Sequence, residues 1–230
     1  MSLKNPGNKR TYDDGCAMAH ALDLVGERWG LLVIRELMLG PKRFTDLRAS
    51  LPGISPNVLT QRLEELEAVS VLRHRKLPPP IAAQVYELTA WGLELEPIIR
   101  EIGRWAARSP HMPDNAPMSV NSLVLSFRTM FSAEAARGLK ANLQLRLSGE
   151  PFRTTIADGR IEIERGDVAQ PDATIDGDAN AIAGLVYGGV DLGKAMRASE
   201  LKVTGDTALV KRFATLFPLP EPAPDVGKAG

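Results

Sequence analysis

The sequence predicts an α+β protein in which helices and a two-stranded hairpin come first and an antiparallel sheet with covering helices follows. Apolar residues at helical spacing dominate the first half, whereas apolar and polar residues alternate over several short stretches of the second half. Strands and helices do not alternate regularly, so a parallel βαβ sheet is not expected. We expect one domain at 1–110 and another at 120–217, joined by a proline-containing linker at 111–119 and followed by a flexible tail at 218–230.

Composition narrows the possible functions. The 230 residues balance 28 Lys and Arg against 28 Asp and Glu, so a protein that holds nucleic acid by bulk positive charge is not expected. The single cysteine excludes an intramolecular disulfide and a multi-cysteine zinc site. No apolar stretch is long enough for a signal-peptide core or a membrane span, so we expect a cytoplasmic protein without a membrane partner.

The first domain begins with helices. They are predicted at 17–27, 30–39, 44–50 and 55–68. Apolar spacing in the first two predicts buried side chains at Leu22, Val25, Leu32 and Leu37. The fourth helix starts at Ser55, an N-cap residue that a proline follows at the first helical position. Its inward leucine stripe leaves Asn57, Thr60 and Gln61 on the outer side and Arg62 at the flank.

Two strands follow at 71–76 and 84–88, joined by a proline-rich loop that is expected to project from the domain. The order helix, break, helix, hairpin is that of a winged helix-turn-helix, whose second helix enters the DNA major groove while the hairpin reaches the backbone or an adjacent groove. Residues 42–76 carry seven basic and four acidic side chains, which favours this use. The candidate DNA-binding residues are Arg43, Ser55, Asn57, Thr60, Gln61, Arg62, Arg73, His74, Arg75 and Lys76.

Among these residues, the polar side chains early in the fourth helix suit base edges, and the basic side chains of the hairpin suit phosphates. The alternative is an ordinary solvated polar surface. The next segment, 89–108, carries an apolar stripe at coiled-coil spacing, which Pro97 is expected to kink or split. The stripe packs either on its own domain or against a second copy of the chain, and we favour the second copy. The candidate dimer-interface residues are Trp91, Leu95, Ile98, Ile102 and Trp105.

The second domain is predicted to combine strands with helices. The strands are expected at 143–147, 152–156, 161–163, 173–175 and 201–204. The helices are expected at 120–138, 180–187, 191–198 and after Asp206. Asp158 and Gly159 form a tight-hairpin signal between the second and third of these strands.

Reactive side chains are few. No nucleophile elbow, phosphate-binding loop or paired-acid signature is present, so neither an enzyme nor a bound cofactor is expected. Cys16 and His20 are four residues apart, but two ligands make only half of a metal site, and no metal is expected. Cys16 precedes a helix start, a position that lowers a thiol pKa and favours oxidation, which makes it a candidate redox sensor. The alternative is a buried small side chain.

Four motifs cover most of the first half. They are Cys16-Ala-Met-Ala-His-Ala-Leu-Asp-Leu-Val-Gly-Glu-Arg-Trp29, Leu31-Leu-Val-Ile-Arg-Glu-Leu37, Arg43-Phe-Thr-Asp-Leu47 and Leu51-Pro-Gly-Ile-Ser-Pro-Asn-Val-Leu-Thr-Gln-Arg-Leu-Glu-Glu-Leu66. In order and extent they resemble the HxlR-type transcriptional regulators over about residues 14–108. The resemblance implies a dimeric winged-helix regulator of the broader MarR-like type, with the helix at 55–68 and the wing at 73–84 on operator DNA. It also places Cys16 where some members carry a redox-sensing or electrophile-sensing cysteine.

The second half resembles the sterol-carrier-protein fold over about residues 120–217. The stretches that carry this resemblance are 143–147, 157–159, 171–175 and 201–212. The resemblance implies a sheet and helices around an apolar tunnel for a fatty acyl or other lipid-like ligand. The candidate pocket residues are Phe127, Phe131, Ile156, Ile163, Leu185, Phe213 and Leu216. Inward apolar residues at these spacings more often form a plain core than a ligand wall, and the alternative is a domain that reinforces a dimer without a ligand.

These observations predict a DNA-binding transcriptional regulator that acts as a homodimer on a near-palindromic operator and senses an apolar ligand through its C-terminal domain. The alternative from another class is a lipid-binding carrier whose winged-helix domain serves only for dimerisation or protein interaction.

Overall fold

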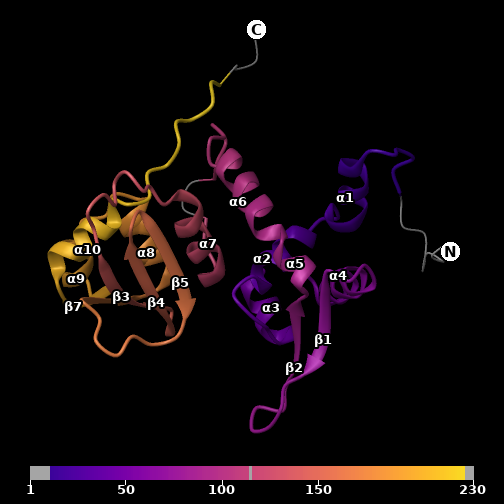
Figure 1. Ribbon diagram of the computed structural model, residues 1–230, viewed down its shortest axis with the longest axis horizontal. Coiled ribbons are helices and arrows are strands. Elements are labelled where there is room, and N and C mark those ends of the chain that lie inside the picture. Colours follow the sequence, from indigo (N-terminus) through magenta and orange to yellow (C-terminus); the bar gives the residue numbers. More distant parts are fainter. Residues whose placement is uncertain (1–10, 114–115, 226–230) are drawn as a thin grey trace. The chain divides into compact units, whose positions relative to one another are not determined.

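The computed structural model describes residues 11–113 and 116–225, which fall into two compact units that divide between Glu96 and Pro97 (Figure 1). The α+β class predicted from the sequence is confirmed. The division lies before the predicted linker, and the domain limits derived from the sequence stay a prediction. Part of the predicted tail is held by a hydrogen bond within the second unit. The Ala223 N–H donates to the Arg108 carbonyl at 2.7 Å. None of the helices in the described residues is long and apolar enough to cross a lipid bilayer.

The first unit is mainly helical. Its elements are α1 (Ala17–Val25), α2 (Gly30–Leu37), α3 (Phe44–Ser50), α4 (Pro56–Ala68), β1 (Leu72–Lys76), β2 (Gln84–Leu88) and α5 (Ala90–Leu93). The large buried side chains of its core include Ile34, Leu37, Leu47, Leu59 and Leu63, from α2, α3 and α4. The start of α4 is as predicted, since the Ser55 hydroxyl accepts a hydrogen bond from the Val58 N–H at 3.3 Å.

Two predicted core positions are wrong. Leu22 and Leu32 are each 39% exposed, whereas Leu37 is buried as expected. Leu22 is exposed because α1 packs shallowly and buries a single side chain, that of Ala19. Leu32 is exposed because α2 buries the face that carries Val33, Ile34 and Leu37, and Leu32 lies outside that face. An apolar face of α1 therefore remains open in the isolated chain.

The wing is an antiparallel hairpin that extends away from the helices of the first unit (Figure 1). Its register pairs Leu72 with Leu88 and Lys76 with Gln84, so the two strands match in length. Lys42 pairs with Tyr86 on the free side of β2 as an isolated bridge, through hydrogen bonds of 3.0 and 2.8 Å. The segment before α3 thus fixes the base of the wing.

The second unit contains a sheet and helices. Its elements are α6 (Leu95–Ala106, which begins at the end of the first unit), α7 (Val120–Met130), β3 (Ala141–Leu147), β4 (Glu150–Ala157), β5 (Arg160–Arg165), β6 (Ala173–Gly177), α8 (Ala179–Val186), α9 (Leu192–Arg197), β7 (Leu201–Gly205) and α10 (Thr207–Ala214). The strand order is β5-β4-β3-β6-β7. At the β4–β5 hairpin, Asp158 and Gly159 both have positive φ, as a tight type I′ turn requires.

The sheet is mixed, whereas the sequence predicted an antiparallel one. β3 and β6 pair in parallel, and the other three pairings are antiparallel. The chain returns from β5 to the far side of β3 through residues 166–172, so β6 enters the sheet in the same direction as β3. Gln144 holds this crossing segment, because its side-chain oxygen accepts a hydrogen bond from the Val168 N–H at 2.7 Å.

Candidate nucleic-acid interface

The outer face of α4 presents short polar side chains. Leu59, Leu63 and Leu66 are buried on the inner side of the helix. Asn57, Thr60 and Gln61 are exposed, and the amide nitrogen of Gln61 donates to the Glu65 carboxylate at 3.0 Å. The Ser55 hydroxyl is exposed and caps the helix, so it fixes where the exposed face begins. Amide and hydroxyl groups of this kind suit the edges of bases in a major groove.

Arg62 does not belong to this exposed face, which corrects its predicted place at the flank. Its side chain is 8% exposed, and its Nη1 atom lies 2.6 Å from Glu65 and 3.3 Å from Glu27. Residue 62 precedes Leu66 by one helical turn and therefore lies on the buried side. Glu27, at the turn between α1 and α2, supplies a partner that helical periodicity did not indicate. A guanidinium held in this way is not available to a base edge.

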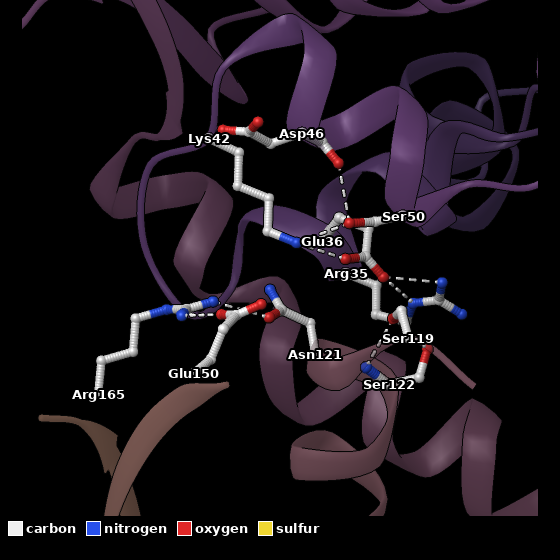
Figure 2. Close-up of polar contacts among 10 residues, drawn as sticks. All are labelled: Arg35, Glu36, Lys42, Asp46, Ser50, Ser119, Asn121, Ser122, Glu150 and Arg165. Atoms are coloured by element: carbon white, nitrogen blue, oxygen red, sulfur yellow. Dashed lines mark hydrogen bonds and ion pairs between the residues drawn. The ribbon is translucent and has the colours of Figure 1, made fainter. Parts of the chain in front are cut away.

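Lys42 connects α2, α3 and the wing. Its ammonium group lies 2.8 Å from the buried Glu36 carboxylate of α2 and 3.1 Å from the Ser50 hydroxyl at the end of α3 (Figure 2). Arg35 contacts the other oxygen of Glu36 at 2.9 Å. Because the Lys42 backbone also pairs with Tyr86, one residue joins the helical core to β2. The neighbouring Arg43 is exposed at the start of α3.

The basic side chains of the wing fall on two faces. Successive residues of a strand point to opposite sides, so Arg73 and Arg75 share one face and His74 and Lys76 the other. On the second face, the His74 ring stacks on Tyr86 with ring centroids 4.6 Å apart. Burial and the nearby Glu67 and Glu64 charges raise the pKa of Tyr86. The four predicted phosphate contacts therefore do not form a single surface.

On the first face, both arginines contact Glu87 of β2, at 2.6 Å for Arg73 and 2.7 Å for Arg75. Partial burial alone would raise the pKa of Glu87, but hydrogen bonds and charge from Arg75 and Arg73 lower it. The sequence reasoning missed Glu87 as a member of the wing surface. The pairing of 71–76 with 84–88 contained the signal, since that register sets Glu87 opposite Arg73.

The candidate dimer surface is exposed in the single chain. Trp91 of α5 and Ile98, Ile102 and Trp105 of α6 are exposed, with Trp105 at 76%, and Leu95 is half-buried. The predicted kink is a break before α6, and Pro97 lies in the first turn, where no backbone N–H is needed. On the opposite side of α6, Arg100 and Arg104 donate to the carbonyls of Arg128 and Thr129 at the end of α7.

Cys16 is exposed and free, which contradicts a buried structural role. It is the N-cap residue of α1, and the backbone amides of Met18 and Ala19 lower the pKa of its thiol. His20 is also exposed. Across residues 11–113 and 116–225, no group of three or more His, Cys, Asp or Glu side chains is arranged to hold a metal ion.

The candidate ligand residues of the second unit lie in its core. All are buried except Phe131, which is half-buried. Phe127 contacts Phe213 with centroids 5.7 Å apart and Phe217 with centroids 4.6 Å apart, and Phe131 also contacts Phe217. Tyr187 lies beside this cluster, with its ring centroid 6.2 Å from that of Phe127, and its hydroxyl forms a 2.9 Å hydrogen bond with the Ser126 hydroxyl. Burial raises the pKa of Tyr187.

A surface hollow of about 590 Å³ lies elsewhere in this unit. It is lined by Ser148, Gly149, Asp176, Gly177, Asp178, Ser199, Glu200 and Lys202. These residues are polar or small and include none of the predicted pocket residues. The hollow is therefore not the apolar tunnel that the sequence predicted, and a tunnel lined by the predicted residues stays a prediction.

Comparison with known proteins matches each of two parts of the chain to a protein family. Residues 24–113 match the family described as HxlR-like helix-turn-helix, and residues 126–218 match the SCP-2 sterol transfer family. The HTH-type transcriptional regulator YodB of Bacillus subtilis (strain 168) is 38% identical over 89 residues, which are 39% of this chain and 80% of YodB. YvaP of the same organism, also an HTH-type transcriptional regulator, is 38% identical over 86 residues, 37% of this chain and 80% of YvaP.

Among solved structures, the reduced form of YodB from B. subtilis has a TM-score of 0.39 and 36% identity, and the match covers 43% of this chain and 96% of that one. The sequence matches to YodB and YvaP cover most of the length of each relative. The chain therefore belongs to the HxlR-type family of helix-turn-helix transcriptional regulators, and after that region it carries a domain of the SCP-2 sterol transfer family.

Proposed function

We propose that the protein binds operator DNA as a homodimer, with the outer face of α4 in the major groove and the wing against the phosphate backbone. The observation that carries the proposal is the outer face of α4, where Asn57, Thr60 and Gln61 are exposed on a helix whose leucine side is buried. Asn and Gln bind adenine with two hydrogen bonds, which gives such a face sequence preference. The cytoplasm, where bacterial operator DNA lies, is the proposed site of action.

The proposed dimer forms through the apolar face of α6. Ile98, Ile102 and Trp105 are exposed in the single chain, and burying them against a second copy removes apolar surface from water. Two copies related by a twofold axis set their α4 helices about 34 Å apart, in successive major grooves. The operator is then a near-palindrome.

We propose that the C-terminal domain responds to a fatty acyl or similar apolar ligand. Its match to the SCP-2 sterol transfer family supports this proposal. Because Phe127, Phe213 and Phe217 contact one another, a ligand in this core has to separate aromatic side chains. A ligand changes DNA binding only if it binds with different affinity to two spacings of the recognition helices.

Cys16 is the second proposed input. Its exposure and lowered pKa favour reaction with oxidants. If oxidation of Cys16 releases DNA, diamide treatment lowers DNA affinity in the wild type and not in Cys16→Ser. Equal release of DNA from both proteins would show that another group responds to diamide.

The first experiment is fluorescence anisotropy with the full-length protein, using the DNA upstream of its own gene and a scrambled duplex over a salt series. Tighter binding of the upstream DNA that persists near 150 mM salt supports the regulator, because non-specific phosphate binding falls steeply with salt. Absence of DNA binding at every salt concentration, together with tight binding of palmitate by the purified protein, favours the lipid carrier instead.

A further inference from the structure

We propose that Glu87 is an internal counter-ion of the wing that holds Arg73 and Arg75 in one orientation and thereby weakens binding to DNA of unrelated sequence. This inference rests on the proposed function, in which the two arginines meet phosphates. Glu87 lies in β2, directly across the ladder from Arg73.

The two oxygens of Glu87 are divided between the arginines. Oε1 accepts a hydrogen bond from Nε of Arg73 at 2.7 Å and lies 2.6 Å from Nη2 of the same side chain. Oε2 lies 2.7 Å from Nε of Arg75. The Nε and Nη2 atoms form an edge of the guanidinium that commonly binds two oxygens of a phosphate. For Arg73, the carboxylate thus occupies donors that a phosphate would use.

Burial differs across this contact. The Glu87 side chain is 12% exposed, whereas Arg73 is 64% and Arg75 40% exposed. The carboxylate therefore lies beneath two guanidinium groups that keep further N–H donors toward solvent. Its negative charge offsets one of their two positive charges, at a position that solvent screens less than an open surface site.

The Glu87 contact is expected to affect binding to operator DNA and binding to DNA of unrelated sequence differently. Arginines held by Glu87 fit phosphates in one placement of the wing, and α4 sets that placement when it docks in its operator. A duplex of unrelated sequence offers no fixed docking, and its affinity comes from charge alone. Unrestrained arginines would follow the phosphates of any duplex, so loss of Glu87 strengthens random binding more than operator binding.

The test compares full-length wild type with Glu87→Gln, by fluorescence anisotropy on the upstream duplex and a scrambled duplex from 50 to 250 mM salt. Glu87→Gln keeps the side-chain shape and removes the charge. The scrambled duplex is expected to bind roughly threefold more tightly at low salt, with a log–log salt slope steeper by about one. Affinity for the upstream duplex is expected to change less than about twofold, so discrimination falls.

Two further variants separate charge from structure. Glu94→Gln makes the same change in net charge at an exposed site in the first unit, and it is expected to leave both affinities as in wild type. Glu87→Asp keeps the charge on a shorter side chain and is expected to restore most of the discrimination. If Glu87→Gln does not fold, Glu87→Asp still tests the inference. Its shorter side chain holds the arginines less fully, so its affinity for the scrambled duplex is expected to lie slightly above that of wild type, and an affinity equal to or below that of wild type would overturn the inference.

The outcomes distinguish the inference from the function beneath it. If Glu87→Gln weakens both duplexes alike, Glu87 only supports the hairpin and the inference is wrong. If wild type prefers the upstream duplex and Glu87→Gln does not change that preference, the inference fails while the proposed function stands. If wild type binds neither duplex, both fail.

Discussion

The ammonium group of Lys42 lies 2.8 Å from Oε2 of Glu36, and the Glu36 side chain is fully buried. Removing a carboxylate from water is costly unless cations and hydrogen bonds compensate. Lys42 and Arg35 provide this compensation from two sides. Because Lys42 also pairs with Tyr86 through its backbone, the buried ion pair holds the wing to α2.

Lys42→Met is expected to lower the unfolding free energy of the first unit by about 3 kcal/mol, because it leaves a buried carboxylate with one cation fewer. Hydrogen exchange of peptides from α2, α3 and β2 measures this loss as faster exchange in all three elements. Lys76→Met is the matched control, since Lys76 is exposed at the end of β1. If both variants exchange alike, the buried pair contributes no more than a surface lysine.

Arg62→Met is expected to destabilise the first unit by about 1 to 2 kcal/mol, because the ion pairs of a largely buried guanidinium with Glu65 and Glu27 are lost. Sequence preference on DNA should stay as in wild type, since the guanidinium is turned away from the outer face. Urea unfolding and anisotropy on matched duplexes measure the two effects separately.

Gln61→Ala is the complementary change on the same helix. Gln61 is exposed, so its stability effect is expected to be small, whereas discrimination between operator and scrambled DNA should fall by about 1 to 3 kcal/mol. A loss of discrimination in Arg62→Met and none in Gln61→Ala would reverse the roles assigned to these two residues.

Ile102→Asp is expected to convert the proposed dimer to a monomer, because it introduces a charge into the centre of the apolar face of α6. Size-exclusion chromatography with light scattering measures the mass of the particle. Glu101→Gln changes the neighbouring, polar side of the same helix and should leave the dimer intact. A wild-type protein that is monomeric at micromolar concentration would refute this interface.

The thiol of Cys16 should react with iodoacetamide faster in the folded protein than in urea at pH 7. Amides of Met18 and Ala19 lower its pKa, so the thiolate fraction at a given pH is larger when α1 is formed. The midpoint of the rate against pH shifts downward on folding. Because the chain has one cysteine, the label reports this site alone. Identical midpoints in both states would show that the helix start has no effect.

Periodicity and capping predicted most elements of the fold. α3 spans the predicted residues, and Ser55 and Asp206 cap the helices that follow them. The parallel pairing of β3 and β6 was not predictable in this way, since strand order depends on how a long connection crosses the sheet. Leu22 and Leu32 were misplaced because helical spacing identifies an apolar face without showing what covers it.

The candidate interface was predictable only in part. Asn57, Thr60 and Gln61 follow from the leucine stripe of α4, which places them opposite the core. The place of Arg62 could not be predicted because its partner Glu27 lies 35 positions earlier in the sequence, and the two residues meet only in the folded unit. The contact of Glu87 with Arg73 depends on the register of β1 against β2. Ionic partners of this kind come from packing, which spacing along one element does not encode.

The anchoring of α6 has a practical consequence for dissecting the protein. Arg100 and Arg104 donate to the carbonyls that end α7, and the Arg108 side chain donates to the Glu221 carbonyl at 3.0 Å. A fragment cut within the proline-containing segment would keep α6 and lose every one of these acceptors. Crystallisation or binding studies of an isolated winged-helix fragment would then examine a helix with both its polar and its apolar sides uncovered, which favours non-native association.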